Sequence, residues 1–330
     1  MNTQTTIEHL YIEIPNFKNK VITSYHYFIE NINKQLILLT NNYQLKLKTI
    51  YFANKSKAVL PIIFLEQLLI LLNPFSLTIE QYNFECTINN TNVITLQLLS
   101  KFKINRLVWK IISFQNQLSS NYHCQQSINL INGAINLKFT NFSIDLKYNL
   151  PHQTIIDVNN DLQICIQLKT PHISYDSYNK NQNLNIKKNI NNFLKKKKYD
   201  NYEYYSYTNN PNNQSKYIIG YCLLENYYGI GRNAVSYIKT QKQTLIINNS
   251  KQKINVLSAN ETLMYKLGQG LLLKKGIPIN NNDHFCQQPF INKLIKNKQI
   301  KITNNHLSCT NKSWLLLNDL IIDIITNTII

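Results

Sequence analysis

The sequence is poor in glycine and arginine. It has 7 glycines among 330 residues, where ordinary usage is about 7%, and its arginines are Arg106 and Arg232 alone. Lysine therefore carries nearly all of the net charge of +18 at pH 7. The depleted residues have codons rich in guanine and cytosine, so we interpret the composition as drift in an AT-rich, reduced genome. Lysine is a poor substitute for arginine in the bidentate hydrogen bonds that identify bases, so we do not expect a nucleic-acid partner.

The sequence also lacks the segments that would direct it to a membrane. Residues 1–10 have neither the basic start nor the apolar run of a signal peptide. The apolar stretches 61–72 and 314–330 are too short or too interrupted by polar residues to span a bilayer. The 6 cysteines form no CxxC pair, which predicts reduced, mostly buried thiols and a cytoplasmic location. Phosphate-loop, G-x-S-x-G and H-E-x-x-H motifs are missing from the sequence.

Strand-like and helix-like segments alternate through residues 9–178. The strand-like runs are 9–14, 46–52, 81–87, 106–112, 139–146 and 172–178, and the helix-like runs between them are 25–39, 60–72, 93–102, 127–135 and 154–168. Repeated units of this kind predict an α/β fold in which helices lie outside a parallel sheet. Their number indicates a partial (β/α)6 barrel rather than a complete eight-fold one.

The chain after residue 178 has a different pattern. A polar stretch ends in four lysines, Lys195–Lys198, which we interpret as a solvated helix end or linker; an RNA-contacting patch is the alternative. Tyr199–Tyr207 has the residues of a strand. Ala259–Ile330 predicts two helices, a hairpin around Lys298–Cys309 and a last helix from Trp314.

These patterns divide the chain into two parts. We expect a partial barrel over residues 1–200 and a C-terminal region over 201–330. Within that region we expect a strand segment over 201–240 and a small, mostly helical, winged-helix-like domain over 259–330.

Several motifs occur in a recognisable order along the chain. They are HLYIEIP (9–15), KTIYF (48–52), INRL (104–107), SIDLKYNLPHQT (143–154), HISYDSY (172–178) and NYYGIGRNAVSY (226–237). In this order they resemble the HemW branch of the radical S-adenosylmethionine family, the haem chaperones also described as oxygen-independent coproporphyrinogen III oxidase-like proteins. The strongest single match is SIDLKYNLPHQT, because the family has an Asp-Leu-x-Tyr-x-Leu-Pro-x-Gln-Thr run there.

The resemblance implies a [4Fe–4S] cluster, S-adenosylmethionine and haem as cofactors or cargo. The family holds its cluster on a Cys-x3-Cys-x2-Cys loop, because thiolates bind such irons well. Counted from Ile14-Pro15, the three positions fall on Phe17, Val21 and Ser24, and the first cysteine of the chain is Cys86. We therefore expect neither a cluster at this site nor reductive cleavage of S-adenosylmethionine.

The S-adenosylmethionine site is also altered. The family's Gly-Gly-Gly-Thr-Pro stretch, where the backbone approaches the methionine end, corresponds here to Ala53–Lys57 and contains no glycine. The resemblance leaves Glu85 on the third strand and Asp145 on the fifth as remnants of the site. The alternatives are a surface strand end for Glu85 and, for Asp145, a barrel-interior charge paired with a lysine.

A haem-related motif of the family, His-Asn-x-x-Tyr-Trp, corresponds here to YIIGYC at 217–222. Tyrosine and cysteine can both be axial haem ligands. Tyr217, Tyr221 and Cys222 are thus candidate haem contacts, and a tyrosine-rich strand packed on the barrel is the alternative.

The resemblance predicts a HemW-like protein that binds haem or a porphyrin and passes haem to an acceptor protein without radical chemistry. One alternative is an active coproporphyrinogen III oxidase-like enzyme of porphyrin metabolism. The others are a basic RNA-associated protein and a non-functional relic. The residues leave open whether the chain is an enzyme.

Overall fold

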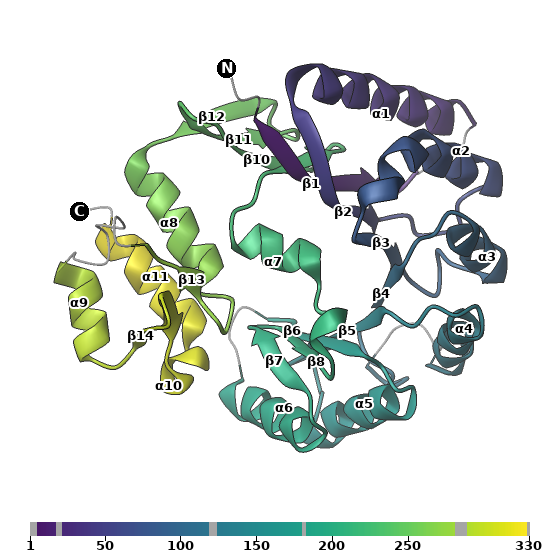
Figure 1. Ribbon diagram of the computed structural model, residues 1–330. Coiled ribbons are helices and arrows are strands. Elements are labelled where there is room, and N and C mark those ends of the chain that lie inside the picture. The colour runs from purple at the N-terminus through teal and green to yellow at the C-terminus, as the bar shows by residue number, and fades with distance from the viewer. Residues whose placement is uncertain (1–4, 18–21, 119–123, 180–182, 281–288, 329–330) are drawn as a thin grey trace.

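The computed structural model describes residues 5–17, 22–118, 124–179, 183–280 and 289–328. Six strand–helix units form its first part (Figure 1). The strands are β1 (Thr6–Ile14), β2 (Gln44–Asn54), β3 (Gln81–Cys86), β4 (Arg106–Lys110), β5 (Phe142–Tyr148) and β6 (His172–Ser177). The helices are α1 (Ile22–Asn42), α2 (Ile62–Leu72), α3 (Val93–Lys101), α4 (Cys124–Asn136), α5 (Ile155–Gln167) and α6 (Leu184–Lys196), with a short 3-10 helix, η1 (Asn73–Thr78).

Strands β1 to β6 are neighbours in that order and pair in parallel. Figure 1 shows them as a curved wall with α1 to α6 on its outer side. The predicted α/β fold with a partial (β/α)6 barrel is confirmed.

The two faces of the curved sheet have different chemistry. On β1, Leu10 and Ile12 belong to the main hydrophobic core between the sheet and the outer helices. Tyr11, which alternates with them, belongs to a separate cluster with Tyr51 and Val108. Successive side chains of a strand point to opposite faces, so this second cluster lies inside the barrel.

The rest of the chain extends this sheet and adds a C-terminal module. Its elements are β7 (Asp200–Glu203), β8 (Ser206–Thr208), η2 (Pro211–Asn213), α7 (Lys216–Cys222), β9 (Tyr227–Ile230), β10 (Val235–Lys239), β11 (Thr244–Asn248), β12 (Lys253–Leu257), α8 (Ala259–Gly270), β13 (Ile277–Pro278), α9 (Pro289–Lys296), β14 (Ile300–Thr303), β15 (His306–Cys309), α10 (Asn311–Trp314) and α11 (Leu317–Thr328).

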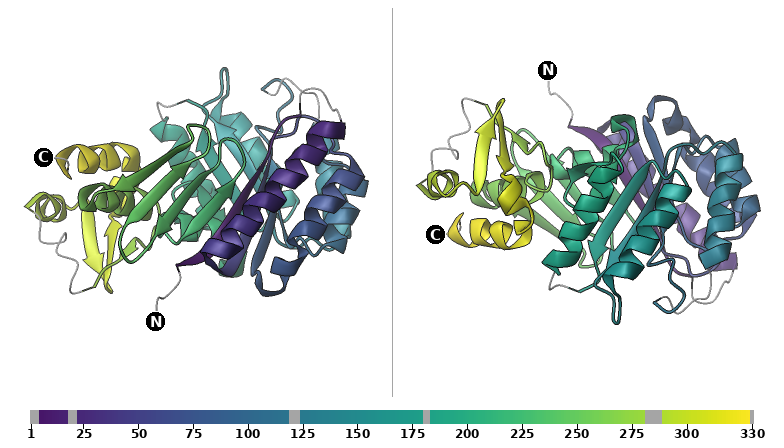
Figure 2. Two further views of the ribbon diagram at one scale, coloured as in Figure 1. Left: turned by 90° about the horizontal axis from the view of Figure 1, so that it is seen from above. Right: turned by 90° about the horizontal axis from the view of Figure 1, so that it is seen from below.

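Strands from this second part join both edges of the barrel sheet. β8 pairs antiparallel with β6 and β7 with β8, while β9 pairs in parallel with β1 and leads to β10, β11 and β12. The C-terminal module has its own core, which runs from Leu267 to Ile324 and includes Tyr204. Figure 2 shows this module at the opposite end of the molecule from α1 to α4. A domain boundary at residue 200 stays a prediction.

Two secondary-structure predictions for this part need correction. Tyr199–Tyr207 is not one strand, because the chain reverses between β7 and β8 to form a hairpin. Residues 217–222 form helix α7 instead of a strand. Ser215 begins this helix, since its hydroxyl accepts a hydrogen bond from the backbone N–H of Ile218. The hairpin predicted around Lys298–Cys309 is confirmed as β14 and β15.

Helix α7 lies within the curve of the barrel strands (Figure 1). Gly220 allows this close approach, because a Cβ atom there would lie 2.2 Å from Nε2 of His9 on β1. None of the helices in the described part of the chain has the length and apolarity that a bilayer crossing requires.

Candidate functional site at the barrel mouth

The loop that would hold an iron–sulfur cluster is occupied by an aromatic contact. The ring of Phe17 packs against Tyr25, Phe28 and Phe64, with centroids 4.4, 5.7 and 5.5 Å away. Ser24 is exposed on α1, and Val21 lies outside the described residues. A phenylalanine ring offers iron no ligating atom, so the side chains of this loop do not fit a [4Fe–4S] cluster.

Lys110 connects the two carboxylates that the sequence predicts as remnants of a cofactor site. Its ammonium lies 3.2 Å from Glu85 and 2.7 Å from Asp145. The three residues meet because they lie near the carboxyl ends of neighbouring parallel strands, β3, β4 and β5. The alternative role for Asp145 was a barrel-interior charge paired with a lysine, and Lys110 is that lysine.

Glu85 has further partners on its other side. Its side chain is only 6% exposed, and Lys55 pairs with it at 3.2 Å. The hydroxyl of Tyr51 donates to Glu85 at 2.8 Å. The alternative of a surface strand end is therefore wrong for Glu85.

The groups around Lys110 affect its protonation. Burial alone would lower the pKa of Lys110, but Asp145, Tyr51 and Glu85 outweigh it and hold that pKa well above its ordinary value. The lysine is thus a permanent cation at neutral pH. Since Lys55 and Lys110 already neutralise the two carboxylates, the ammonium group of S-adenosylmethionine would have to displace a lysine to pair there.

A cavity of 370 Å³ opens beside this ion-pair network. Ionisable side chains from four strands line it, together with apolar side chains and one face of α7. Its lining includes Lys110, Asp145, Lys147, Asp176, Glu203, Ile218, Tyr221, Cys222 and Leu272. The structure thus brings Asp145 together with two of the three candidate haem contacts, Tyr221 and Cys222.

The third candidate, Tyr217, lies elsewhere on α7. Its ring stacks against Tyr51 and Tyr11, with centroids 4.8 and 6.1 Å away. Tyr217 therefore packs the barrel interior and does not line the cavity.

Tyr221 and Cys222 would each have to release a proton to bind iron. Burial raises the pKa of Tyr221 and raises that of the Cys222 thiol well above its ordinary value. Both groups thus keep their protons, while iron binds the thiolate or phenolate form. They can contact a flat apolar ligand, but their protonation disfavours coordination of its metal.

Comparisons with known proteins agree with the motif order. No family model matches the chain. A HemW-like heme chaperone protein of Buchnera aphidicola subsp. Baizongia pistaciae is 27% identical over 342 residues, covering 92% of this chain and 89% of the relative. Heme chaperone HemW of Lactococcus lactis subsp. lactis is 25% identical over 317 residues, with 83% of each chain covered.

One solved structure shares the whole fold. It is coproporphyrinogen III oxidase HemN from Escherichia coli, described as a radical SAM enzyme, with a TM-score of 0.75 at 14% identity. The alignment covers 97% of this chain and 89% of HemN. The chain is HemW-like. The predicted resemblance to the HemW/HemN-like branch of the radical S-adenosylmethionine family is confirmed.

Sequence reasoning missed much of the charged lining of the HemW-like barrel mouth. Lys110 ends the strand between those of Glu85 and Asp145, so strand adjacency was a signal that could have found it. Asp176 is paired with Lys147, and both lie near the ends of neighbouring strands. Glu203 offered no such signal, because it comes from the unexpected hairpin.

Proposed function

We propose that this HemW-like chain binds haem and passes it to an acceptor protein without cleaving S-adenosylmethionine. The two HemW-named relatives support the cargo, since each matches this chain over most of its length. The observation that carries the loss of radical chemistry is Phe17 at the first cluster position, where its ring packs against Tyr25 and Phe64. A cytoplasmic location and the acceptor are part of the same proposal.

The barrel mouth is one of two cavities beside α7 against which a porphyrin could lie. A cavity of 370 Å³ falls within the range of ligand sites, about 300–1,000 Å³. Tyr221 and Cys222 are the candidate contacts there, through their apolar faces. The likeness to HemN concerns the fold, and an oxidase activity would need cluster ligands that Phe17 does not supply.

The lysines at 195–198 have a structural explanation that requires no RNA partner. Lys195 and Lys196 lie in the last turn of α6, and cations are favourable at a helix C-terminus because they complement its dipole. All four side chains are exposed, as expected of a solvated helix end.

A two-part experiment tests the proposal. Anaerobic reconstitution with iron and sulfide should give no stoichiometric cluster and no charge-transfer absorption. Titration with ferric haem should shift the Soret band with saturation at one haem per chain, and mixing with apomyoglobin should then move haem to that acceptor. A stoichiometric cluster would refute the loss of radical chemistry. Absence of any Soret shift at micromolar haem would refute haem binding.

A further inference from the structure

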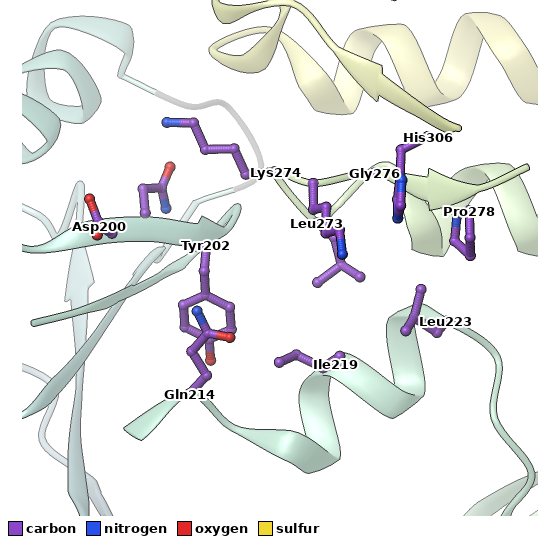
Figure 3. A pocket seen from close by; sticks show the side chains of 12 residues that line it. Asp200, Tyr202, Gln214, Ile219, Leu223, Leu273, Lys274, Gly276, Pro278 and His306 are labelled. Carbon is purple, nitrogen blue, oxygen red and sulfur yellow. The ribbon is translucent and has the colours of Figure 1, made fainter. Parts of the chain in front are cut away.

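A second cavity lies against a different face of α7. It has a volume of 490 Å³ and is lined on one side by Ile219 of that helix and by Leu223, which follows the helix. Figure 3 shows the opposite side, where Leu273, Pro278 and His306 of the C-terminal module lie across the space from the helix. Apolar side chains from the barrel and the C-terminal module make up most of the cavity surface, and Asp200, Asn201, Tyr202 and Gln214 add polar groups to it.

His306 is the group in this wall with the chemistry of a metal ligand. Its Nδ1 lies 2.8 Å from the backbone oxygen of Asn304. A carbonyl oxygen can only accept, so Nδ1 carries a proton, and in the neutral imidazole the free lone pair is then on Nε2. Figure 3 shows the imidazole directed from the start of β15 toward the cavity. Metal-binding histidines are typically oriented in this way, with the second ring nitrogen donating to a carbonyl or carboxylate.

Two lysines, Lys274 and Lys275, belong to the same lining, and the Lys274 side chain extends to the side away from His306 (Figure 3). Lys274 and Lys275 are exposed, and no carboxylate in the described part of the chain lies within 4.0 Å of either ammonium. Gly276 holds this segment against β15: its φ is +81°, and a Cβ there would lie 2.1 Å from the backbone oxygen of Leu307. The glycine thus fixes two unneutralised cations at the edge of the apolar space.

Resting on the haem binding proposed above, we propose that this cavity holds haem with Nε2 of His306 as the axial iron ligand. Haem has a flat apolar ring, two carboxylates, and an iron that binds neutral imidazole. The cavity offers apolar walls, an imidazole of fixed tautomer, and the cations Lys274 and Lys275. The barrel mouth offers protonated Tyr221 and Cys222 and lysines that are already paired.

Ferric-haem titration of matched variants tests the assignment. We expect His306→Ala to bind haem at least about tenfold more weakly, because it lacks one metal ligand. The variant should also lose the electronic and EPR signature of imidazole ligation. Added imidazole should restore that signature by entering the space left in His306→Ala. His26→Ala is the control, because His26 is exposed on α1, where it pairs with Glu30 of the same helix. Circular dichroism checks that each variant folds.

The outcomes separate this inference from the proposed function. If the wild-type chain gives no Soret shift, haem binding itself fails. If the wild type binds haem and His306→Ala keeps its affinity and spectrum, haem binding stands and the His306 site is refuted. In that case Cys222→Ala and Tyr221→Phe identify whether the barrel mouth supplies the ligand.

Discussion

The two cavities beside α7 differ in how their charged groups are satisfied. At the barrel mouth, Lys110 bridges Glu85 and Asp145, and Lys147 pairs with Asp176. In the cavity that includes His306, the lysines at 274 and 275 have no carboxylate within ion-pairing distance in the described residues. The charges of the first cavity neutralise one another, whereas the lysines of the second remain available to pair with a ligand.

This difference separates stabilising charges from binding charges. A paired buried charge contributes to the fold, and removing one partner leaves the other desolvated and uncompensated. An exposed, unpaired lysine contributes little to stability but can pair with a ligand carboxylate. Substitutions at the mouth should therefore mainly change folding stability, and those around His306 should mainly change haem binding.

The largest expected effect concerns Glu203 in the wall of the barrel mouth. Burial raises its pKa to about 7 from the unfolded value of 4.5, against the opposing hydrogen bonds from Ser206 and Tyr205. The folded state thus favours the protonated acid. This contribution to stability is complete below pH 4.5 and is lost as the pH rises through 7. Relative to Glu203→Gln, the wild type should lose at most about 3 kcal/mol of unfolding free energy across this range.

Urea unfolding at a series of pH values measures this loss. Glu261→Gln is the control, because Glu261 lies in an exposed capping box with Ser258 that lowers its pKa. That variant should run parallel to the wild type between pH 5 and 8. Parallel curves for Glu203→Gln would show that the mouth does not hold Glu203 in its protonated form.

A smaller effect compares one lysine from each cavity. Lys110→Met removes the cation between Glu85 and Asp145. Because these partly or wholly buried carboxylates are then left without that partner, the unfolding free energy should fall by about 2 kcal/mol. Lys274→Met should stay within about 0.5 kcal/mol of the wild type. Equal losses in urea unfolding at pH 7 would contradict the distinction between the two cavities.

The barrel was predictable because its signals are local and repeated. Each strand–helix unit carries its own periodicity, and the motif order supplied the connectivity. The segment 217–222 was not predictable in this way, since its aromatic and β-branched residues favour a strand. Ser215, a common first residue of helices, was the contrary signal. The hairpin after α6 turns at Tyr204-Tyr205, which lacks the usual glycine, asparagine or proline of a turn.

The sites were less predictable than the fold because their parts come from distant segments. Glu85 and Asp145 were placed by motif, but Lys110 becomes their partner only when the three strands lie side by side. The cavity at His306 combines residues from β7, α7, the segment 273–276 and two C-terminal strands. No spacing in the sequence connects Ile219 with His306, so their proximity follows from tertiary packing alone.

The smallest effect concerns Lys274 and Lys275 in the cavity that includes His306. The double variant Lys274→Gln, Lys275→Gln should weaken ferric-haem binding about threefold to tenfold, since each exposed ion pair contributes up to about 1 kcal/mol. The loss should shrink as ionic strength rises, because salt screens exposed charges beyond about 10 Å at 0.1 M. The imidazole signature of His306 should be unchanged, because these lysines bind the haem carboxylates and not the iron. The matched control is Lys196→Gln, Lys197→Gln, which removes the same charge at the exposed end of α6. An equal loss in both double variants would show that haem responds to the net charge of the chain, and that the unpaired lysines of this cavity make no contact with it.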